Sequence, residues 1–235
     1  MPIRVKLADS TQKHPQVLYL YDTFKTALRK AGLASEEQQI IWTALDFATE
    51  RHHGFPRKDQ AQTPYIIHPL SVASILLIEA YISDASILAA AILHDTVEDT
   101  SANFTEITEI FGSEISSLVN EVTDEMDENC EKKIHDKQTR KIREVEHACI
   151  LSPSAQCIKL ADKLSNLHDL LLHPPRNWSL ERSLSYVQFC EDILTHTQAS
   201  NRRNCTTELS LGIKALERLL QNKIDKTRKH LTEKS

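Results

Sequence analysis

Hydrophobic residues recur every three or four positions along most of the chain, which is the spacing of one face of an α-helix. The first such face stops near Gly32 and consists of Leu18, Tyr21, Phe24 and Leu28. Ser35 is followed by acidic residues, as is typical of an N-cap, and begins a second predicted helix that continues through Ala48. The same spacing predicts further helices over residues 69–81, 84–95, 101–123 in two pieces around Gly112, 155–172, 179–198 and 205–229.

The segments between these helices are rich in charge and carry no strand pattern. Residues 54–67 contain Gly54 and Pro56 and are predicted to form a loop, whereas residues 125–143 are either a long loop or a solvated helix. No internal repeat or hairpin signal interrupts the series. We therefore expect an all-α, single-domain helical bundle. We place a leader and helix at 1–34, the main domain at 35–229 and a polar tail at 230–235.

Composition agrees with a helical protein and argues against several other classes. Only four of the 235 residues are glycine, and the formal net charge of −5 gives no support to nucleic-acid binding. The five cysteines include no CxxC pair, which favours a reducing cytoplasm over a disulfide framework. No apolar run approaches the roughly 18 residues that span a membrane. We therefore expect a cytoplasmic protein without a membrane or nucleic-acid partner.

The candidate chemistry begins where an apolar helix turns polar, in AAAILHDTVEDT at residues 89–100. Burying several ionisable groups is costly unless they are paired or bind a metal ion. On one continuous helix, His94 and Glu98 would be i,i+4 neighbours, and so would Asp95 and Asp99. His94 and Asp95 would then hold a cation, and Glu98 and Asp99, one turn further on, would orient or deprotonate a water. The alternative is that the helix simply emerges into solvent at His94.

Two further residues complete a candidate ligand set. His68 precedes a proline that suits a helix start, and Asp162 lies beside the buried stripe of the 155–172 helix. Taken alone, His68 could be a structural histidine and Asp162 a salt-bridge partner of a neighbouring lysine. Together with His94 and Asp95 they make a mixed nitrogen and oxygen set, which suits Mn²⁺, Fe²⁺ or Zn²⁺ better than Ca²⁺. A water on such an ion becomes a hydroxide nucleophile near neutral pH.

Several motifs occur together in a fixed order: RKDQAQTPYIIHP (57–69), AAILHDTVEDT (90–100), EVTDE (121–125) and IKLADKLSNLHDL (158–170). With NWSLERSLSYVQ (177–188), they resemble the HD superfamily of metal-dependent phosphohydrolases. More narrowly, they are similar to the hydrolase domain of RelA/SpoT-type enzymes and to the stand-alone small alarmone hydrolases. The resemblance covers roughly residues 36–225. The chain departs from it at Phe55–Pro56, where the family often has glutamine after the glycine, and in a longer segment before Lys137.

The resemblance implies an HD-type helical fold and hydrolysis of the 3′-pyrophosphate of ppGpp or pppGpp, giving GDP or GTP and pyrophosphate. No synthetase region is recognised, so the chain is expected to degrade alarmone and not to make it. One Mn²⁺ per chain would be bound by His68, His94, Asp95 and Asp162, with Glu98 and Asp99 catalytic. The substrate-binding positions implied are Arg57, Lys58, Tyr65, Lys137, Asn166, Trp178, Arg182 and Tyr186.

The residues themselves agree in kind, because a highly anionic nucleotide needs cations near the metal. Arg57–Lys58 and Lys137–Arg143 are the local basic clusters, although either could be a solvated surface. Two alternatives stay open. The same metal site could act on another nucleotide, such as the ribose 2′-phosphate of NADPH, or the chain could be a nucleotide sensor without turnover. A sensor is expected to lack a ligand or an acidic residue, and all six positions are filled here.

Overall fold

The computed structural model describes residues 14–123, 136–200, 202 and 205–233. Within these residues the secondary structure is helical, and the only strand-like feature is an isolated bridge between Pro56 and Pro64. The helices, in chain order, are α1 Pro15–Lys30, α2 Ser35–Arg51, α3 Ile67–Ser74, the π-helical turn η2 Ile75–Glu79, α4 Ala85–Leu93, α5 Thr96–Asp99, α6 Phe104–Val122, α7 Lys137–His147, α8 Pro153–Leu172, α9 Leu180–Gln198 and α10 Thr207–Glu233. The prediction of an all-α fold is confirmed.

Local signals explain several helix boundaries. The Asp84 carboxylate accepts a hydrogen bond from the Ile87 N–H at 3.0 Å and so caps α4, as predicted. Gly112 has a φ of +83°, which breaks α6 into the two pieces expected from the sequence. The predicted cap at Ser35 is wrong by one residue. Ala34 is the N-cap, and its N–H is satisfied by the carboxylate of Glu37 at 2.7 Å.

Other boundaries also differ from the predictions, and three of the differences bear on the domain and the site. The apolar helix does not continue to Asp99, because α4 ends at Leu93 and α5 is a separate short helix. The charged segment predicted at 125–143 is helical from residue 137 as part of α7, and residues 124–135 lie outside the described part. At the C-terminal end, α10 runs to Glu233, so residues 230–233 are helical where we expected a polar tail. The predicted leader at residues 1–13 also lies outside the described residues.

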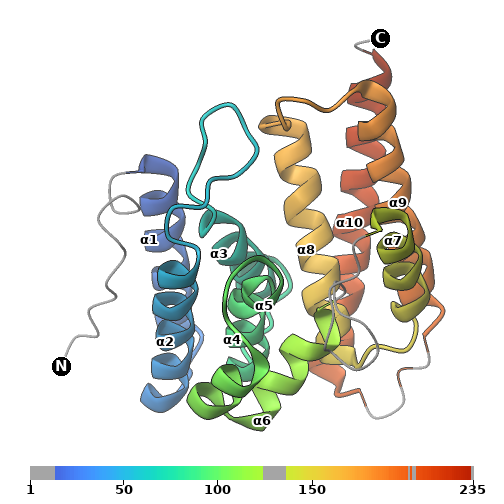
Figure 1. Cartoon of the computed structure of the whole chain (residues 1–235). Coiled ribbons are helices and arrows are strands. Elements are labelled where there is room, and N and C mark those ends of the chain that lie inside the picture. Colours follow the sequence, from blue (N-terminus) through green and yellow to red (C-terminus); the bar gives the residue numbers. More distant parts are fainter. Residues whose placement is uncertain (1–13, 124–135, 201, 203–204, 234–235) are drawn as a thin grey trace.

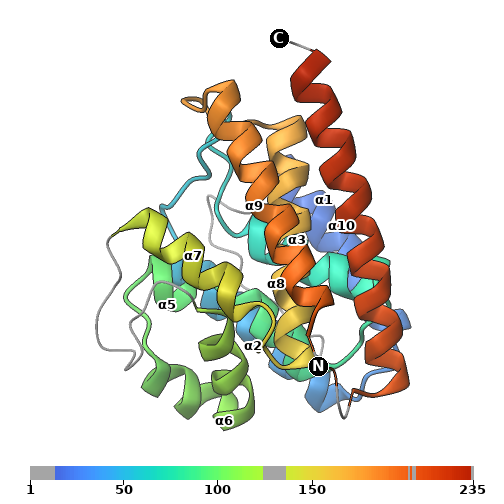
Figure 2. The ribbon, with the colours of Figure 1, turned by 90° about the vertical axis from the view of Figure 1, so that its right-hand side faces the viewer.

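One connected cluster of buried apolar side chains extends from α1 to α10 and confirms the single domain. Nearly every side chain of α4 is buried, and this helix contacts α2, α3, α6 and α8. Figure 1 shows α8 and α10 side by side with α9, whereas α1 and α2 lie on the other side of α3 and α4. In Figure 2, α7 lies across α9. Burial of each large aliphatic side chain contributes about 1.5–3 kcal/mol to this core.

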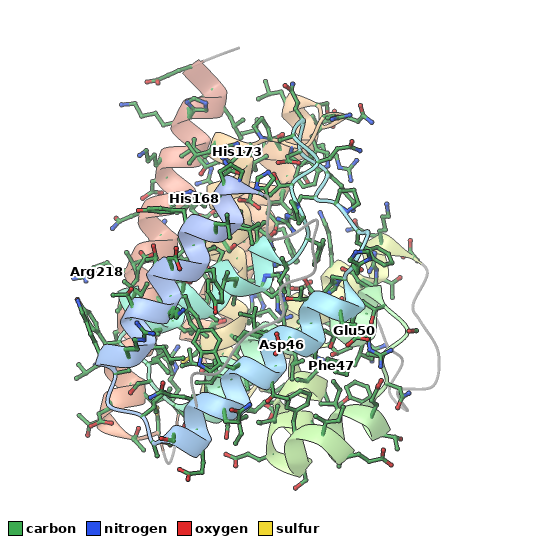
Figure 3. All side chains as sticks on the ribbon, turned by 90° about the vertical axis from the view of Figure 1, so that its left-hand side faces the viewer. Asp46, Phe47, Glu50, His168, His173 and Arg218 are labelled. Carbon is green, nitrogen blue, oxygen red and sulfur yellow. The ribbon has the colours of Figure 1, made fainter. Side chains whose placement is uncertain are left out.

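Close packing extends to the edges of the bundle. Phe47 on α2 meets Phe111 on α6 edge to face, with ring centroids 5.6 Å apart, and Figure 3 shows Phe47 at the side of α2 that faces α6. Gly212 lets α10 approach the turn after η2, because a Cβ atom there would lie 2.7 Å from Ile82 Cγ1. Among the described residues, no helix combines the length and the apolar character that crossing a bilayer requires.

Candidate metal centre and nucleotide pocket

Three separate parts of the chain bring the candidate metal ligands together. His68 lies in the first turn of α3, His94 and Asp95 form the junction between α4 and α5, and Asp162 lies in the middle of α8. Ligand atoms of His68, His94 and Asp162 all lie within 4.8 Å of one another, and the three residues are buried. Asp95 joins them, because its carboxylate oxygens lie 3.1 Å from His94 Nε2 and 3.5 Å from His68 Nε2.

The end of α4 is what aims His94 and Asp95 into this cluster. His94 Nδ1 donates to the Ala91 carbonyl at 2.8 Å, and Thr96 Oγ1 donates to the Leu93 carbonyl at 2.6 Å. These side chains satisfy carbonyls of the last turn, so the helix can stop there without leaving buried acceptors unpaired. The chain then turns, and Asp95 is the N-cap residue of α5. His94 keeps α-helical backbone angles, so the chain leaves the course of α4 only at Asp95.

The hydrogen bonds of the two histidines leave their Nε2 atoms for a cation. Since a carbonyl can only accept, the bond to Ala91 fixes the proton of neutral His94 on Nδ1 and the lone pair on Nε2. His94 Nε2 is buried and faces an Asp95 carboxylate oxygen at 3.1 Å. His68 Nδ1 lies 3.2 Å from Ser165 Oγ, and His68 Nε2 lies 3.1 Å from Asp162 Oδ1. Two imidazoles and two carboxylates in this arrangement fit a first-row divalent metal ion.

Electrostatics at the cluster also favour a bound cation. Burial opposes the charged form of His94, but the adjacent Asp95 carboxylate outweighs burial and raises the pKa of His94 to about 9. Burial and the nearby Arg57 lower the pKa of His68, so this ring is neutral at pH 7. Burial would raise the pKa of Asp95, yet the contacts with His94 hold it below its ordinary value. The carboxylates of Asp95 and Asp162 therefore both face one protonated histidine, and a metal ion would displace the proton of that histidine.

Neighbouring side chains orient the carboxylates. The Tyr65 hydroxyl donates to Asp95 Oδ2 at 2.6 Å, and Asn166 Nδ2 donates to Asp162 Oδ1 at 2.5 Å. Lys163 lies 2.9 Å from Asp162 Oδ2 and pairs on its other side with Glu144 of α7. One oxygen of Asp162 thus faces the histidines and the other faces a lysine, which fixes the rotamer of the carboxylate.

A cavity of about 370 Å³ adjoins the cluster. This volume is in the range of small-molecule sites. Six of the predicted substrate-binding residues line it: Arg57, Lys58, Tyr65, Asn166, Trp178 and Tyr186. Asp99, predicted as catalytic, lines it as well. Burial and the Asp95 carboxylate raise the pKa of Asp99. Gln16 of α1 and His173, which Figure 3 labels near the end of α8, also belong to the wall.

The remaining predicted residues lie outside the cavity wall. Arg182 stacks its guanidinium over the Trp178 ring, 4.7 Å from the centroid. Lys137 is the first residue of α7 and is exposed. Glu98 lies on α5 next to Asp99 and is half-buried. Some of the residues predicted from the sequence therefore line the pocket, and the others lie outside its wall.

Sequence reasoning missed two residues of the pocket. Asp169 Oδ2 accepts from the Arg57 guanidinium at 2.6 Å, and this guanidinium also lies over the Tyr65 ring. Asp169 follows Asn166 by three residues, so the shared helix face was a usable signal. His52 is buried and stacks on Tyr65 with ring centroids 4.6 Å apart, and burial lowers its pKa to about 4. Nothing in the local sequence pattern distinguished His52 from the neighbouring His53.

The helical fold and the cluster define a protein with a candidate metal centre of histidine and aspartate side chains beside a cationic and aromatic pocket. The family model described as "HD domain" matches residues 44–187. The chain belongs to the HD domain family. Outside the matched segment lie α1 and α10, although both contribute to the common core.

Individual relatives show which proteins of this family the chain is similar to. The protein named guanosine-3′,5′-bis(diphosphate) 3′-pyrophosphohydrolase MESH1 from Homo sapiens is 43% identical over 171 residues, which are 73% of this chain and 91% of that protein. Its counterpart from Xenopus tropicalis is 42% identical over 167 residues, or 71% and 89% of the two chains. A solved structure titled as a metazoan ortholog of SpoT that hydrolyzes ppGpp is 37% identical. It superposes with a TM-score of 0.64 and covers 76% of this chain and 94% of that chain.

Proposed function

We propose that this chain hydrolyses the 3′-pyrophosphate of ppGpp and pppGpp, giving GDP or GTP and pyrophosphate. The observation that carries the proposal is the buried cluster of His68, His94, Asp95 and Asp162 beside a pocket with cations and aromatic rings. The chain is also 42% identical, over 167 residues, to a relative named for this reaction.

Within this proposal, His68, His94, Asp95 and Asp162 hold one divalent ion, for which Mn²⁺ is our first choice. Zn²⁺ and Fe²⁺ suit the same donor set. When bound, such an ion lowers the pKa of a coordinated water and polarises a phosphoryl oxygen. The fit rests on the hydrogen bond from His94 Nδ1 to Ala91, because it leaves Nε2, 3.1 Å from an Asp95 oxygen, as the atom that would bind the ion once its proton is lost.

The acidic residues of α5 manage the proton of the attacking water. Asp99 lines the pocket, and its raised pKa makes its carboxylate a better base than an ordinary aspartate. Glu98, one residue earlier, is assigned to orienting the water. The water attacks the phosphorus bonded to the ribose 3′-oxygen, that P–O bond breaks, and the 3′-oxygen leaves with a proton as pyrophosphate departs.

The pocket walls fit a guanosine that carries two pyrophosphate groups. Arg57 and Lys58 supply positive charge on one wall, where Asp169 holds Arg57 in place. Trp178 and Tyr186, with ring centroids 5.4 Å apart, offer aromatic faces to the base. Asn166 can contact the nucleotide as well as Asp162. Arg182 and Lys137 would bind phosphates from the rim once substrate is present.

We also propose that the chain acts on free nucleotides in the cytoplasm and not on nucleic acid. The net charge of −5 supports this assignment, because general nucleic-acid binding requires a basic surface. The positive residues that the proposal needs are confined to the pocket and its rim.

The test is a substrate panel with protein that has been stripped of metal and reloaded with Mn²⁺. Purified protein is incubated with ppGpp, pppGpp and NADPH, and pyrophosphate and phosphate are quantified separately. We expect pyrophosphate from the first two, loss of turnover on chelation, and loss in Asp95→Ala but not in Asp225→Ala, which removes an exposed carboxylate from α10. Phosphate release from NADPH at a far higher rate would displace the proposal in favour of a 2′-phosphatase.

A further inference from the structure

The loop between Phe55 and Tyr65 is closed upon itself. The Arg57 N–H donates to the Thr63 carbonyl at 2.7 Å, and the Tyr65 N–H donates to the Phe55 carbonyl at 3.0 Å. The Asp59 carboxylate accepts from both the N–H and the hydroxyl of Thr63, at 3.0 and 2.6 Å. This local closure fixes the shape of the loop. It does not fix how the loop stands relative to α8 and α9.

A second set of contacts joins the loop to the connection between α8 and α9. The Arg176 N–H donates to the Lys58 carbonyl at 3.2 Å, and its Nε donates to the Asp59 carbonyl at 3.1 Å. Its Nη2 donates to the carbonyl of Gln60. One residue thus serves three consecutive carbonyls of a loop more than a hundred positions away in the sequence. In Figure 1 this loop rises beside the upper end of α8, from which the connection to α9 departs.

Arg176 itself is exposed and does not line the cavity, yet it joins two of the cavity's walls. Arg57 and Lys58 belong to one wall, and Trp178, two residues after Arg176, belongs to the other. The loop also contacts α8 through the Arg57 side chain, which donates to Asn166 and Asp169. These contacts involve a side chain that an anionic substrate would itself attract. Arg176 holds the loop through the backbone carbonyls of the loop, so the Arg57 side chain remains available to bind the ligand.

We propose that Arg176 is a positioning residue for substrate binding, which fixes Arg57 and Lys58 at a set distance from Trp178 by holding the carbonyls of residues 58–60. The inference rests on the proposed function, because it treats Arg57, Lys58 and Trp178 as substrate contacts. Charge-assisted hydrogen bonds depend steeply on distance and angle, so displacing Arg57 and Lys58 would weaken their contacts with an anionic substrate. The planar guanidinium suits this task, since its donors diverge in one plane, whereas a lysine ammonium cannot span the same carbonyls.

A purely structural role for Arg176 gives a different expectation. If the two side-chain hydrogen bonds only stabilised the fold, their loss would lower the melting temperature and leave the Michaelis constant of the remaining folded enzyme unchanged. A positioning role instead changes KM with little effect on kcat, because the metal centre and Asp99 are held by other contacts. It also loosens the loop in the native state.

The experiment compares Arg176→Ala, Arg176→Lys and Arg228→Ala in the full chain. Arg228 is a matched control, because its guanidinium pairs with Glu191 between α9 and α10 and does not line the cavity. Steady-state kinetics with ppGpp and Mn²⁺ give KM and kcat separately. Hydrogen exchange followed by mass spectrometry reports on peptides that cover residues 55–66, independently of activity.

We expect KM to rise about tenfold in Arg176→Ala, the effect of losing two hydrogen bonds of ordinary strength, with kcat within about twofold. Hydrogen exchange in residues 55–66 should accelerate in Arg176→Ala. The KM and the exchange rate of Arg176→Lys should lie between those of the wild type and Arg176→Ala, and those of Arg228→Ala should match the wild type. Unchanged KM and unchanged exchange in Arg176→Ala would overturn the inference. If the wild type leaves ppGpp intact, the proposed function fails, and unchanged exchange in Arg176→Ala would then still refute the loop anchoring.

Discussion

Replacing Tyr65 by phenylalanine removes one oxygen atom that connects the pocket to the candidate metal centre. In the structure the Tyr65 hydroxyl donates to Asp95 Oδ2 at 2.6 Å. The ring has other contacts, since it stacks on His52 at 4.6 Å and lies under the Arg57 guanidinium at 5.4 Å. Tyr65→Phe keeps these ring contacts and deletes only the donor. The variant therefore separates the role of Tyr65 in the pocket wall from its role in orienting Asp95.

The size of the effect follows from the charge of the acceptor. A hydrogen bond to an ionised carboxylate contributes about 1.5–3 kcal/mol. Removing a group that orients a metal ligand typically weakens metal binding by about 10- to 100-fold. Asp95 keeps His94 Nε2 at 3.1 Å and His68 Nε2 at 3.5 Å, so the fold should survive. We expect weaker Mn²⁺ binding with a nearly unchanged KM for ppGpp at saturating metal.

The assay is a Mn²⁺ titration of the metal-free protein by isothermal calorimetry, with far-ultraviolet circular dichroism as the check on folding. Tyr21→Phe serves as the control, because it removes a tyrosine hydroxyl from α1, where the ring packs against Trp42. Equal Mn²⁺ affinity in wild type, Tyr65→Phe and Tyr21→Phe would refute the view that Tyr65 orients a metal ligand. A raised KM with intact metal binding would assign the hydroxyl to the substrate.

Three further predictions test the electrostatics, the core and the packing. Without metal, the pKa of His94 is about 9, above its ordinary value of 6.5. The charged ring therefore stabilises the fold fully below pH 6.5, and this contribution is lost as the pH rises through about 9. Metal binding at pH 7 should therefore release about one proton, measured by calorimetry in buffers of different ionisation enthalpy, and affinity should rise until about pH 9. Burial raises the thiol pKa of Cys157 and Cys190, so neither should react with a thiol reagent until the protein unfolds. Gly212→Ala should destabilise the protein by about 1–3 kcal/mol in urea titrations, since the new Cβ would meet Ile82; an unchanged midpoint would contradict the close packing.

Features encoded over short stretches of sequence were predictable. Asp84 caps a helix and Gly112 interrupts one because each acts on backbone groups within a few residues. The candidate ligands could be named because their residue types and order are unusual for a helical core. Their convergence in the structure agrees with that choice, although the roles of the individual side chains stay predictions.

Contacts between distant helices could not be predicted from periodicity. The break after Leu93 depends on side chains that bond the last carbonyls of α4, and spacing alone favoured a continuous helix. The pairing of Lys163 with Glu144 joins α8 to α7, and Arg176 reaches a loop from the far side of the pocket. Helical periodicity shows which face of an element is buried but not which partner meets it.

The most direct test of the central claim is the product balance of one reaction. Metal-free protein is loaded with one equivalent of Mn²⁺ and given ppGpp, and GDP, pyrophosphate and phosphate are measured over time. We predict GDP and pyrophosphate in equal amounts, no phosphate, and complete loss of both products when Mn²⁺ is chelated. Intact ppGpp in the presence of folded, manganese-loaded protein, or products that persist after chelation, would contradict the account.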